Sequence, residues 1–130
     1  MSVFESDDWT LELPDGWQTE RDDDCDLFFH PDGPGTLEIR AFLAETPFDD
    51  DDLYELAADD LDAGATIGDV EHGDFAGFTF RYREEGVYWR QWRLRSGMLA
   101  LAVSYACALN AAESQDSDVD DLLDGLRVRD

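Results

Sequence analysis

The chain has 130 residues, of which 43% are hydrophobic, including four Trp, four Tyr and eight Phe, which is enough for one domain with its own core. Its formal net charge is −24, from 33 acidic and nine basic residues. Such an excess of negative charge argues against nucleic acid as a partner, because binding to phosphates depends on a positive field.

All nine basic residues are arginines, and 23 of the acids are aspartates. We associate excess acid without lysine with proteins of cells that hold molar salt, where the Debye length is about 3 Å and surface repulsion is screened. In dilute buffer the same charge would oppose the compact state. We therefore expect a salt-adapted protein; the alternative is an acidic protein from a GC-rich genome.

Targeting signals are not apparent in this sequence. The first ten residues, MSVFESDDWT, lack the basic and apolar regions of a signal peptide. Residues 98–109 are apolar but shorter than the roughly 20 residues of a membrane span.

Cys25 and Cys107 are too few and too far apart for a disulfide framework or a zinc site. We expect a cytoplasmic protein with reduced thiols, a buried Cys107, no membrane partner and no cofactor.

The first half of the chain predicts three strands and a helix. Residues 9–13 alternate and stop at the turn sequence Pro-Asp-Gly, residues 26–30 form a short strand, and residues 36–44 form a longer one. Residues 51–63 carry leucines at helical spacing behind a run of aspartates, which a helix dipole favours at its start.

The second half predicts three more strands and a last helix. The strands are residues 75–83, 87–95 and 98–108, and the third is apolar on both faces, which is typical of a central strand covered on both sides. Residues 116–128 carry a helical stripe of Val and Leu, with Gly125 as a weak point inside it. The order predicts a single α+β domain over residues 1–130, with a mainly antiparallel sheet.

Five of the nine arginines lie in residues 81–95, on the two strands of a predicted hairpin. A three-residue loop, 84–86, would pair residue 83 with 87 and 81 with 89, and would place both aromatic rows on one face, with positive φ at Gly86. The opposite face would then present the candidate binding residues Arg81, Arg83, Trp89, Arg93 and Arg95 together.

This arginine face has two interpretations. Carboxylates from an acidic loop or helix of the same molecule would neutralise it. Alternatively, it would bind an acidic ligand or protein partner, helped by an exposed pair of Arg81 over the Trp89 indole, worth about 0.5–1 kcal/mol.

The sequence matches no catalytic or metal-binding pattern well. Asp22, Asp24 and Asp26 have the alternate spacing of a calcium loop, but Leu27 stands where the loop needs Gly and Gly33 where it needs Glu. The run of acids at 116–120 fails in the same way. His30 and His72 have no metal-ligand partner at useful spacing, and no nucleophile elbow, P-loop or dinucleotide fingerprint occurs. We expect no enzyme and no metal site.

Two motifs carry a resemblance: the start W-T-L-E-L-P-D-G-W (9–17) and F-F-H-P-D-G-P-G-T-L-E-I (28–39), followed by one helix and a late hairpin. This arrangement resembles a family of small bacterial and archaeal domains of unknown function with a PsbP-like fold, also the architecture of the Mog-type proteins. The resemblance covers residues 8–128 and implies an antiparallel sheet of about six strands with helices packed on it. It implies no catalytic residues, and it implies packing roles for Trp9 and Trp17.

The resulting function hypothesis is a non-catalytic interaction or accessory module that binds a protein through its arginine face or its acidic surface. One alternative is an inhibitor or immunity protein that meets a basic toxin, since charge complementarity speeds association. Another is a small-molecule carrier with an apolar pocket near Trp89 or Trp92. An enzyme would need a concave site that joins His72 or His30 to carboxylates.

Overall fold

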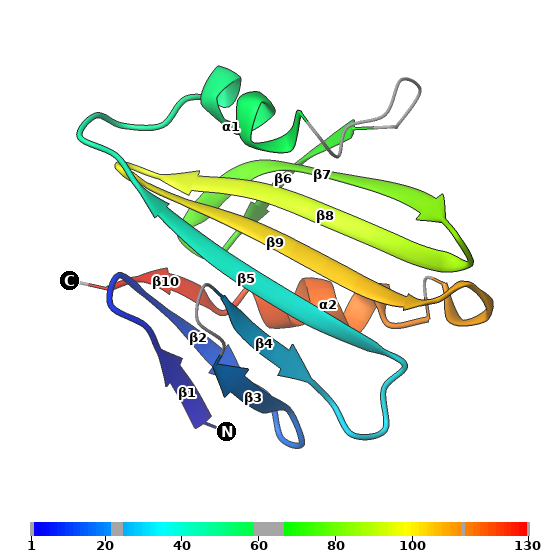
Figure 1. The fold of residues 1–130 in the computed structure, drawn as a ribbon. Coiled ribbons are helices and arrows are strands. Elements are labelled where there is room, and N and C mark those ends of the chain that lie inside the picture. The colour runs from blue at the N-terminus through cyan, green and yellow to red at the C-terminus, as the bar shows by residue number, and fades with distance from the viewer. Residues whose placement is uncertain (1, 22–24, 59–66, 113, 130) are drawn as a thin grey trace.

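The computed structural model describes residues 2–21, 25–58, 67–112 and 114–129, with ten strands and two α-helices among them (Figure 1). All strand pairings are antiparallel. The strands are β1 (Ser2–Glu5), β2 (Trp9–Leu13), β3 (Gln18–Arg21), β4 (Asp26–Phe29), β5 (Gly35–Leu43), β6 (Ile67–His72), β7 (Phe75–Glu84), β8 (Val87–Ser96), β9 (Leu99–Ala108) and β10 (Leu126–Val128). The helices are α1 (Asp50–Ala57) and α2 (Asp116–Leu123), with a short 3₁₀ turn at Leu109–Ala111.

The expected sheet of about six strands is wrong, although the α+β class is confirmed. One sheet has seven strands in the order β3-β4-β5-β9-β8-β7-β6, and a second has three in the order β1-β2-β10. The strands missing from the expectation are short or exposed; every described side chain of β3, for example, is exposed. Such segments show no alternation of apolar and polar residues, so periodicity does not reveal them.

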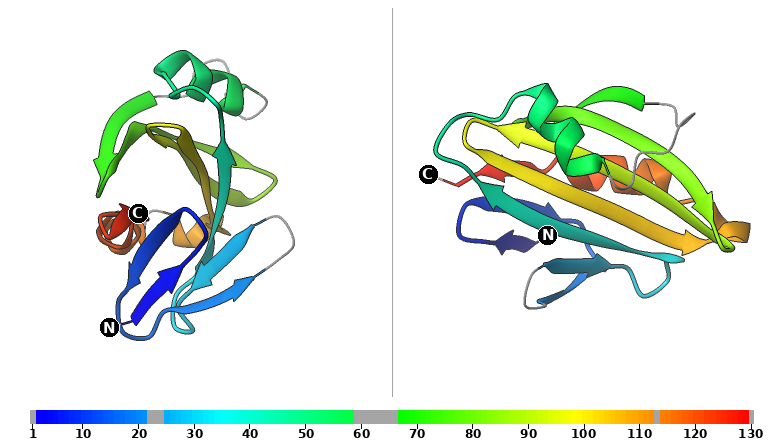
Figure 2. Two further views of the ribbon diagram at one scale, coloured as in Figure 1. Left: turned by 90° about the vertical axis from the view of Figure 1, so that its left-hand side faces the viewer. Right: turned by 45° about the horizontal axis from the view of Figure 1, so that its top comes forward.

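The large sheet is covered on both faces. Figure 2 shows α1 on one side of it, and α2 with the small sheet on the other. The α2 side holds the larger core, which combines leucines and aromatic residues of β2, β4, β5, β8 and β9 with Val119, Leu122 and Leu123 of α2. The α1 side holds a smaller core made of Leu53, Ala57, Phe78, Phe80 and Ala100.

Strand β9 is the middle strand of seven, which confirms the prediction of a central strand from its two apolar faces. Leu99, Leu101, Val103 and Tyr105 belong to the larger core. On the other face Ala100 is fully buried in the smaller core. The small alanine side chains leave room for α1 to approach the sheet. Cys107 is buried, as expected.

Helix α1 begins at a reciprocal capping box. The Asp49 carboxylate accepts from the Asp52 backbone N–H at 2.9 Å, and the Asp52 carboxylate accepts from the Asp49 N–H at 3.0 Å. These bonds satisfy donors that a helix start otherwise leaves open. The predicted helix of residues 51–63 is thus confirmed at its start; the described helix ends at Ala57, and 59–63 lie outside the described residues.

The last helix is shorter than predicted. It ends at Leu123, and Leu126, expected on its apolar stripe, begins β10 and pairs with Leu11 of β2. Gly125 therefore lies after the helix rather than inside it. A Cβ at Gly125 would come within 3.1 Å of the Glu12 side chain, so the chain passes close to β2 at this point.

The hairpin loop has two residues, and the predicted three-residue loop is wrong. Glu84 pairs with Val87, and Glu85 and Gly86 both have positive φ, of 52° and 80°. Positive φ at both central positions is the mark of a type I′ turn, whose twist matches that of the flanking strands. Gly86 does have the expected positive φ. The three-residue loop was predicted because it keeps the aromatic residues on one face and the arginines on the other. In the structure helices or strands cover both faces of the sheet, so the register does not have to separate the two kinds of side chain.

Candidate functional site

The register separates the predicted arginine face into two parts. Arg81 is opposite Arg90, and Arg83 is opposite Tyr88, on the face that carries α2. Trp89, Arg93 and Arg95 lie on the other face, which carries α1; Trp89 is opposite Tyr82 rather than Arg81. The expected common face is therefore wrong, because a two-residue loop shifts the pairing by one residue and exchanges the faces of one strand.

Among the candidate residues, Arg81 and Arg95 form ion pairs with carboxylates of the same molecule, as the first interpretation expects. Arg81 lies 3.4 Å from Asp116 of α2, and Arg95 lies 3.2 Å from Asp50 of α1. The two helices thus bring their acidic first turns to the arginines of β7 and β8. Whether any of the five candidates binds a ligand stays a prediction.

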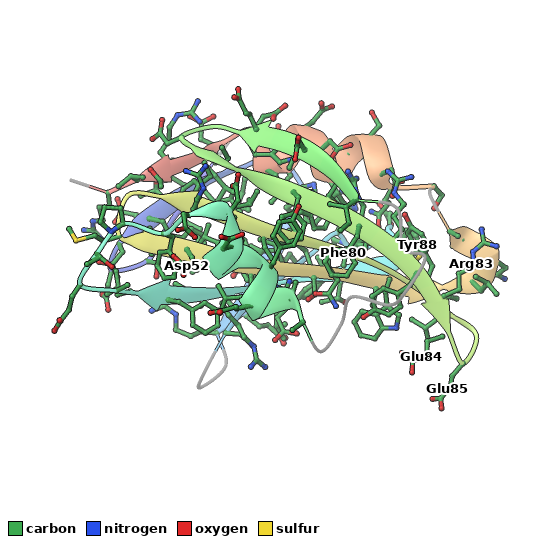
Figure 3. All side chains as sticks on the ribbon, turned by 90° about the horizontal axis from the view of Figure 1, so that it is seen from above. Asp52, Phe80, Arg83, Glu84, Glu85 and Tyr88 are labelled. Atoms are coloured by element: carbon green, nitrogen blue, oxygen red, sulfur yellow. The ribbon has the colours of Figure 1, made fainter. Side chains whose placement is uncertain are left out.

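A groove lies beside α1 on the outer face of the large sheet, and two of the predicted residues, Trp89 and Arg93, line it. Its volume is about 440 Å³, in the range of small-molecule pockets. Figure 3 views this face from above, with Asp52 on α1, and Glu84 and Glu85 at the tip of the β7–β8 hairpin. The lining residues are Glu38, Arg40, Phe42, Leu56, Tyr82, Glu84, Trp89, Gln91, Arg93, Ala102 and Ser104.

A fixed hydrogen-bond network forms the polar part of the groove, with Gln91 at its centre. The Gln91 amide donates to the Tyr82 hydroxyl at 2.8 Å, and its carbonyl oxygen accepts from Ser104 at 2.8 Å and from Arg93 at 3.0 Å. Arg93 also donates to the backbone oxygens of Leu56 and Trp92. Because Gln91 and Arg93 are each 4% exposed, these groups keep one orientation.

An aromatic row leads into the groove. Tyr54 of α1 stacks on Phe78 with centroids 4.7 Å apart, and Phe78, Phe80 and Tyr82 follow along one face of β7. Tyr82 then stacks on Trp89 at 6.2 Å. Tyr54 is exposed, Phe78 and Phe80 belong to the core under α1, and Tyr82 and Trp89 are half-buried in the groove wall.

His72 does meet two carboxylates, a feature that the sequence could not show. Its Nδ1 lies 2.9 Å from Asp124, its Nε2 lies 3.8 Å from Asp120, and Arg90 lies 3.0 Å from the same Asp120 oxygen. The imidazole is 5% exposed, however, and lines neither the groove nor the cavity beside Trp17. His72 links the end of α2 to β6, and Arg90 links α2 to β8 through the same Asp120. Among the described residues no group of three His, Cys, Asp or Glu side chains is placed to hold a metal ion.

Two buried tyrosines hold the start of α2 against the sheet. The Tyr88 hydroxyl donates to Asp116 at 3.2 Å, and the Tyr105 hydroxyl donates to the Gln115 side chain at 2.5 Å. Burial, reinforced by the Asp116 charge, raises the pKa of Tyr88 to about 12. Burial also raises the pKa of Tyr105 above its ordinary value. Both hydroxyls therefore remain protonated donors at neutral pH.

Comparison with known proteins shows the fold alone. No family model matches the chain, and no curated protein matches it. A solved protein of Bacteroides thetaiotaomicron VPI-5482 has a TM-score of 0.67 at 19% identity; the match covers 94% of this chain but 45% of that one. LpqN of Mycobacterium tuberculosis, described as involved in cell envelope biogenesis, has a TM-score of 0.55 at 15% identity, covering 94% of this chain and 83% of that one.

None of the helices in the described part of the chain is long and apolar enough to cross a membrane. The chain spans less than half of the Bacteroides protein, so the likeness applies to one part of that molecule. At these identities the matches support the α+β architecture and carry no activity with them.

Proposed function

We propose that this protein is a non-catalytic binding module whose ligand is a small ring-bearing molecule held in the groove beside α1. The groove brings together what such a ligand needs. Trp89 and Tyr82 offer aromatic surface for a ring, Ala102 and Ser104 make a floor of small side chains, and the Gln91 network offers polar atoms in fixed positions.

The observation that carries the proposal is the buried, fully oriented Gln91 beside the half-buried Trp89 on the same face of β8. Polar side chains in the middle of a sheet are costly unless they are hydrogen-bonded, and this one is bonded to three neighbours. Small-molecule sites typically hold a few polar groups in such fixed positions. Charged side chains such as Glu38 and Arg40 make up much of the remaining wall of this groove. The volume of the groove, about 440 Å³, is that of a small-molecule pocket. A stable protein partner would instead need a contact area on the order of 800 Å² on each side.

A screen of ring-containing fragments by NMR in molar KCl tests the proposal. The expected result is a group of related fragments that shift both the Trp89 indole N–H signal and the Gln91 side-chain amide signals. Trp89→Leu should remove the shifts of the Gln91 side-chain amide signals, because it removes the stacking surface. Trp17→Phe is the matched control, since Trp17 is also half-buried but lies in a different cavity.

Either of two outcomes contradicts the proposal: no fragment shifts the Gln91 and Trp89 signals together, or Trp89→Leu and Trp17→Phe retain the same fragments equally. In that case a basic protein partner on the acidic surface becomes the better candidate. The net charge of −24 supports such a partner through electrostatic attraction.

A PsbP-like fold, a cytoplasmic location and adaptation to salt complete the proposal. The two-helix α+β architecture supports the first, and the scarcity of cysteines, two in 130 residues, supports a reducing compartment. The composition, with nine arginines, no lysine and 33 acids, supports the third.

A further inference from the structure

A second cavity, separate from the groove, lies at the opposite side of the large sheet. It is formed where the turn after β2, the β4–β5 turn and the start of α2 meet, and its volume is about 290 Å³. Its lining residues are Trp17, His30, Asp32, Gly33, Pro34, Ser114, Gln115 and Asp118.

The buried end of this cavity is a Gln115 amide group whose orientation is fixed. Gln115 is 7% exposed, and its side-chain oxygen accepts from the Tyr105 hydroxyl at 2.5 Å. The Tyr105 hydroxyl donates to this oxygen, so the nitrogen at the other end of the amide points away from Tyr105. A Cβ at Gly33 would lie 2.1 Å from this nitrogen, so the amide packs directly on the glycine.

The Gln115 nitrogen donates to no described group, although the residue is more than nine-tenths buried. The nitrogen itself is not fully enclosed, so an oxygen acceptor that enters the cavity can reach this unused donor. Gln115 precedes α2 at its N-cap position, yet its side chain makes no capping bond. Its role is therefore not to begin the helix.

The mouth of the cavity is anionic and aromatic. Asp32 and Asp118 are exposed carboxylates at its rim, and no described cation lies within ion-pair distance of either. The indole of Trp17 forms a wall and is held edge-on to His30, with centroids 6.1 Å apart. The His30 turn is rigid, since the Asp32 N–H donates to the ring at 3.1 Å and the Gly33 N–H donates to the His30 oxygen at 2.9 Å.

We infer that this cavity binds a small organic cation that also carries an oxygen acceptor, as in an amino alcohol. Its cationic end lies at the rim near Asp32, Asp118 and Trp17, where cation–π attraction adds to the charge interaction. The oxygen accepts the hydrogen bond from Gln115. This inference is independent of the ligand proposed for the groove.

Titration of isotope-labelled protein with choline tests the inference, with the neutral isostere of choline, in which carbon replaces nitrogen, as the matched compound. Choline should shift the Gln115 side-chain amide and Trp17 indole N–H signals, and the isostere should shift neither. The double variant Asp32→Asn, Asp118→Asn should raise the dissociation constant at least tenfold. Asp51→Asn with Glu55→Gln removes the same charge from exposed positions on α1 and should bind choline as the native protein does.

Three outcomes would overturn the inference. Choline shifts neither signal; or the isostere binds as well as choline; or the two charge variants bind choline equally, as expected of a diffuse counter-ion. Gln115→Glu gives a further check: it replaces the donor with an acceptor and should abolish the preference for choline over its analogue without the hydroxyl. An unchanged preference would also count against the inference.

Discussion

Arg90 shows how this acidic chain uses a cation inside the fold. It is 4% exposed, lies 3.0 Å from Asp120, donates to Thr79 and lies 4.4 Å above the Trp92 ring. A charge is expensive to bury, and these three contacts compensate for part of its lost hydration, although the buried Nη1 has no hydrogen-bond partner among the described residues. Arg95, by contrast, is an exposed partner of Asp50. The two arginines lie on the same strand but differ in environment.

Replacement of Arg90 by Met should lower the free energy of unfolding by about 2 kcal/mol, because a desolvated cation–π contact and two hydrogen-bonding contacts are lost. Arg95→Met changes the net charge equally but removes only a surface ion pair, so it should cost less than about 1 kcal/mol. Urea unfolding in molar KCl measures both. Equal losses would mean that net charge, not the buried contacts, determines the effect.

The candidate residues in the groove were predictable only in part. Trp89 and Arg93 do line it, but Tyr82, Gln91 and Ser104 were not recognised as a group. Their signal in the sequence is weak: each is a polar or amphipathic residue within a strand, and only the pairing of Gln91 with Ser104 brings them together. That pairing depends on the register of β8 against β9. Because β9 is apolar on both faces, the pattern of apolar residues does not decide this register.

At the level of elements, strong periodicity predicted well and weak periodicity did not. The segments 36–44 and 98–108 agree within one residue with β5 and β9, because the first begins with a clear alternation of apolar and polar residues and the second is apolar on both faces. β6 was missed because five of its six residues are not fully buried. The end of α2 was missed because Leu126 continues the helical spacing while it pairs with β2. Contacts with other parts of the fold determine whether such a segment forms a strand or a helix, and the periodicity of a sequence does not show these contacts.

The type I′ turn of the β7–β8 hairpin holds a glutamate in an unfavourable conformation. Glu85 has a φ of 52°, and it is the one described non-glycine residue with positive φ. Asn tolerates this region better than Glu. Glu85→Asn should therefore raise the free energy of unfolding by about 0.5–1 kcal/mol. Glu84→Gln, at the end of β7, removes the same charge without the conformational gain.

Thermal unfolding of the two variants and the native protein measures the difference. If Glu84→Gln stabilises the protein as much as Glu85→Asn does, reduced charge repulsion explains both, and backbone strain at Glu85 has no measurable role.

At the scale of the whole molecule, charge is the dominant feature. A net charge of −24 on a chain of 130 residues opposes compactness wherever the charges interact over long distances. The ion pairs of Asp50, Asp116 and Asp120 with arginines neutralise a few of the acids locally. The other exposed acids repel one another, and this repulsion reaches about 30 Å in 0.01 M salt but about 3 Å in 1 M salt.

The melting temperature should therefore rise steadily between 0.01 M and 1 M KCl, the range over which the screening length falls by about tenfold. A variant with four exposed acids neutralised, Glu20→Gln, Asp51→Asn, Glu55→Gln and Glu71→Gln, should melt higher in dilute buffer and gain less from salt. Sucrose strengthens burial without screening charge, so it should stabilise both proteins equally. A melting temperature that is independent of KCl, or an equal gain in both proteins, would show that the acidic surface is not an adaptation to salt.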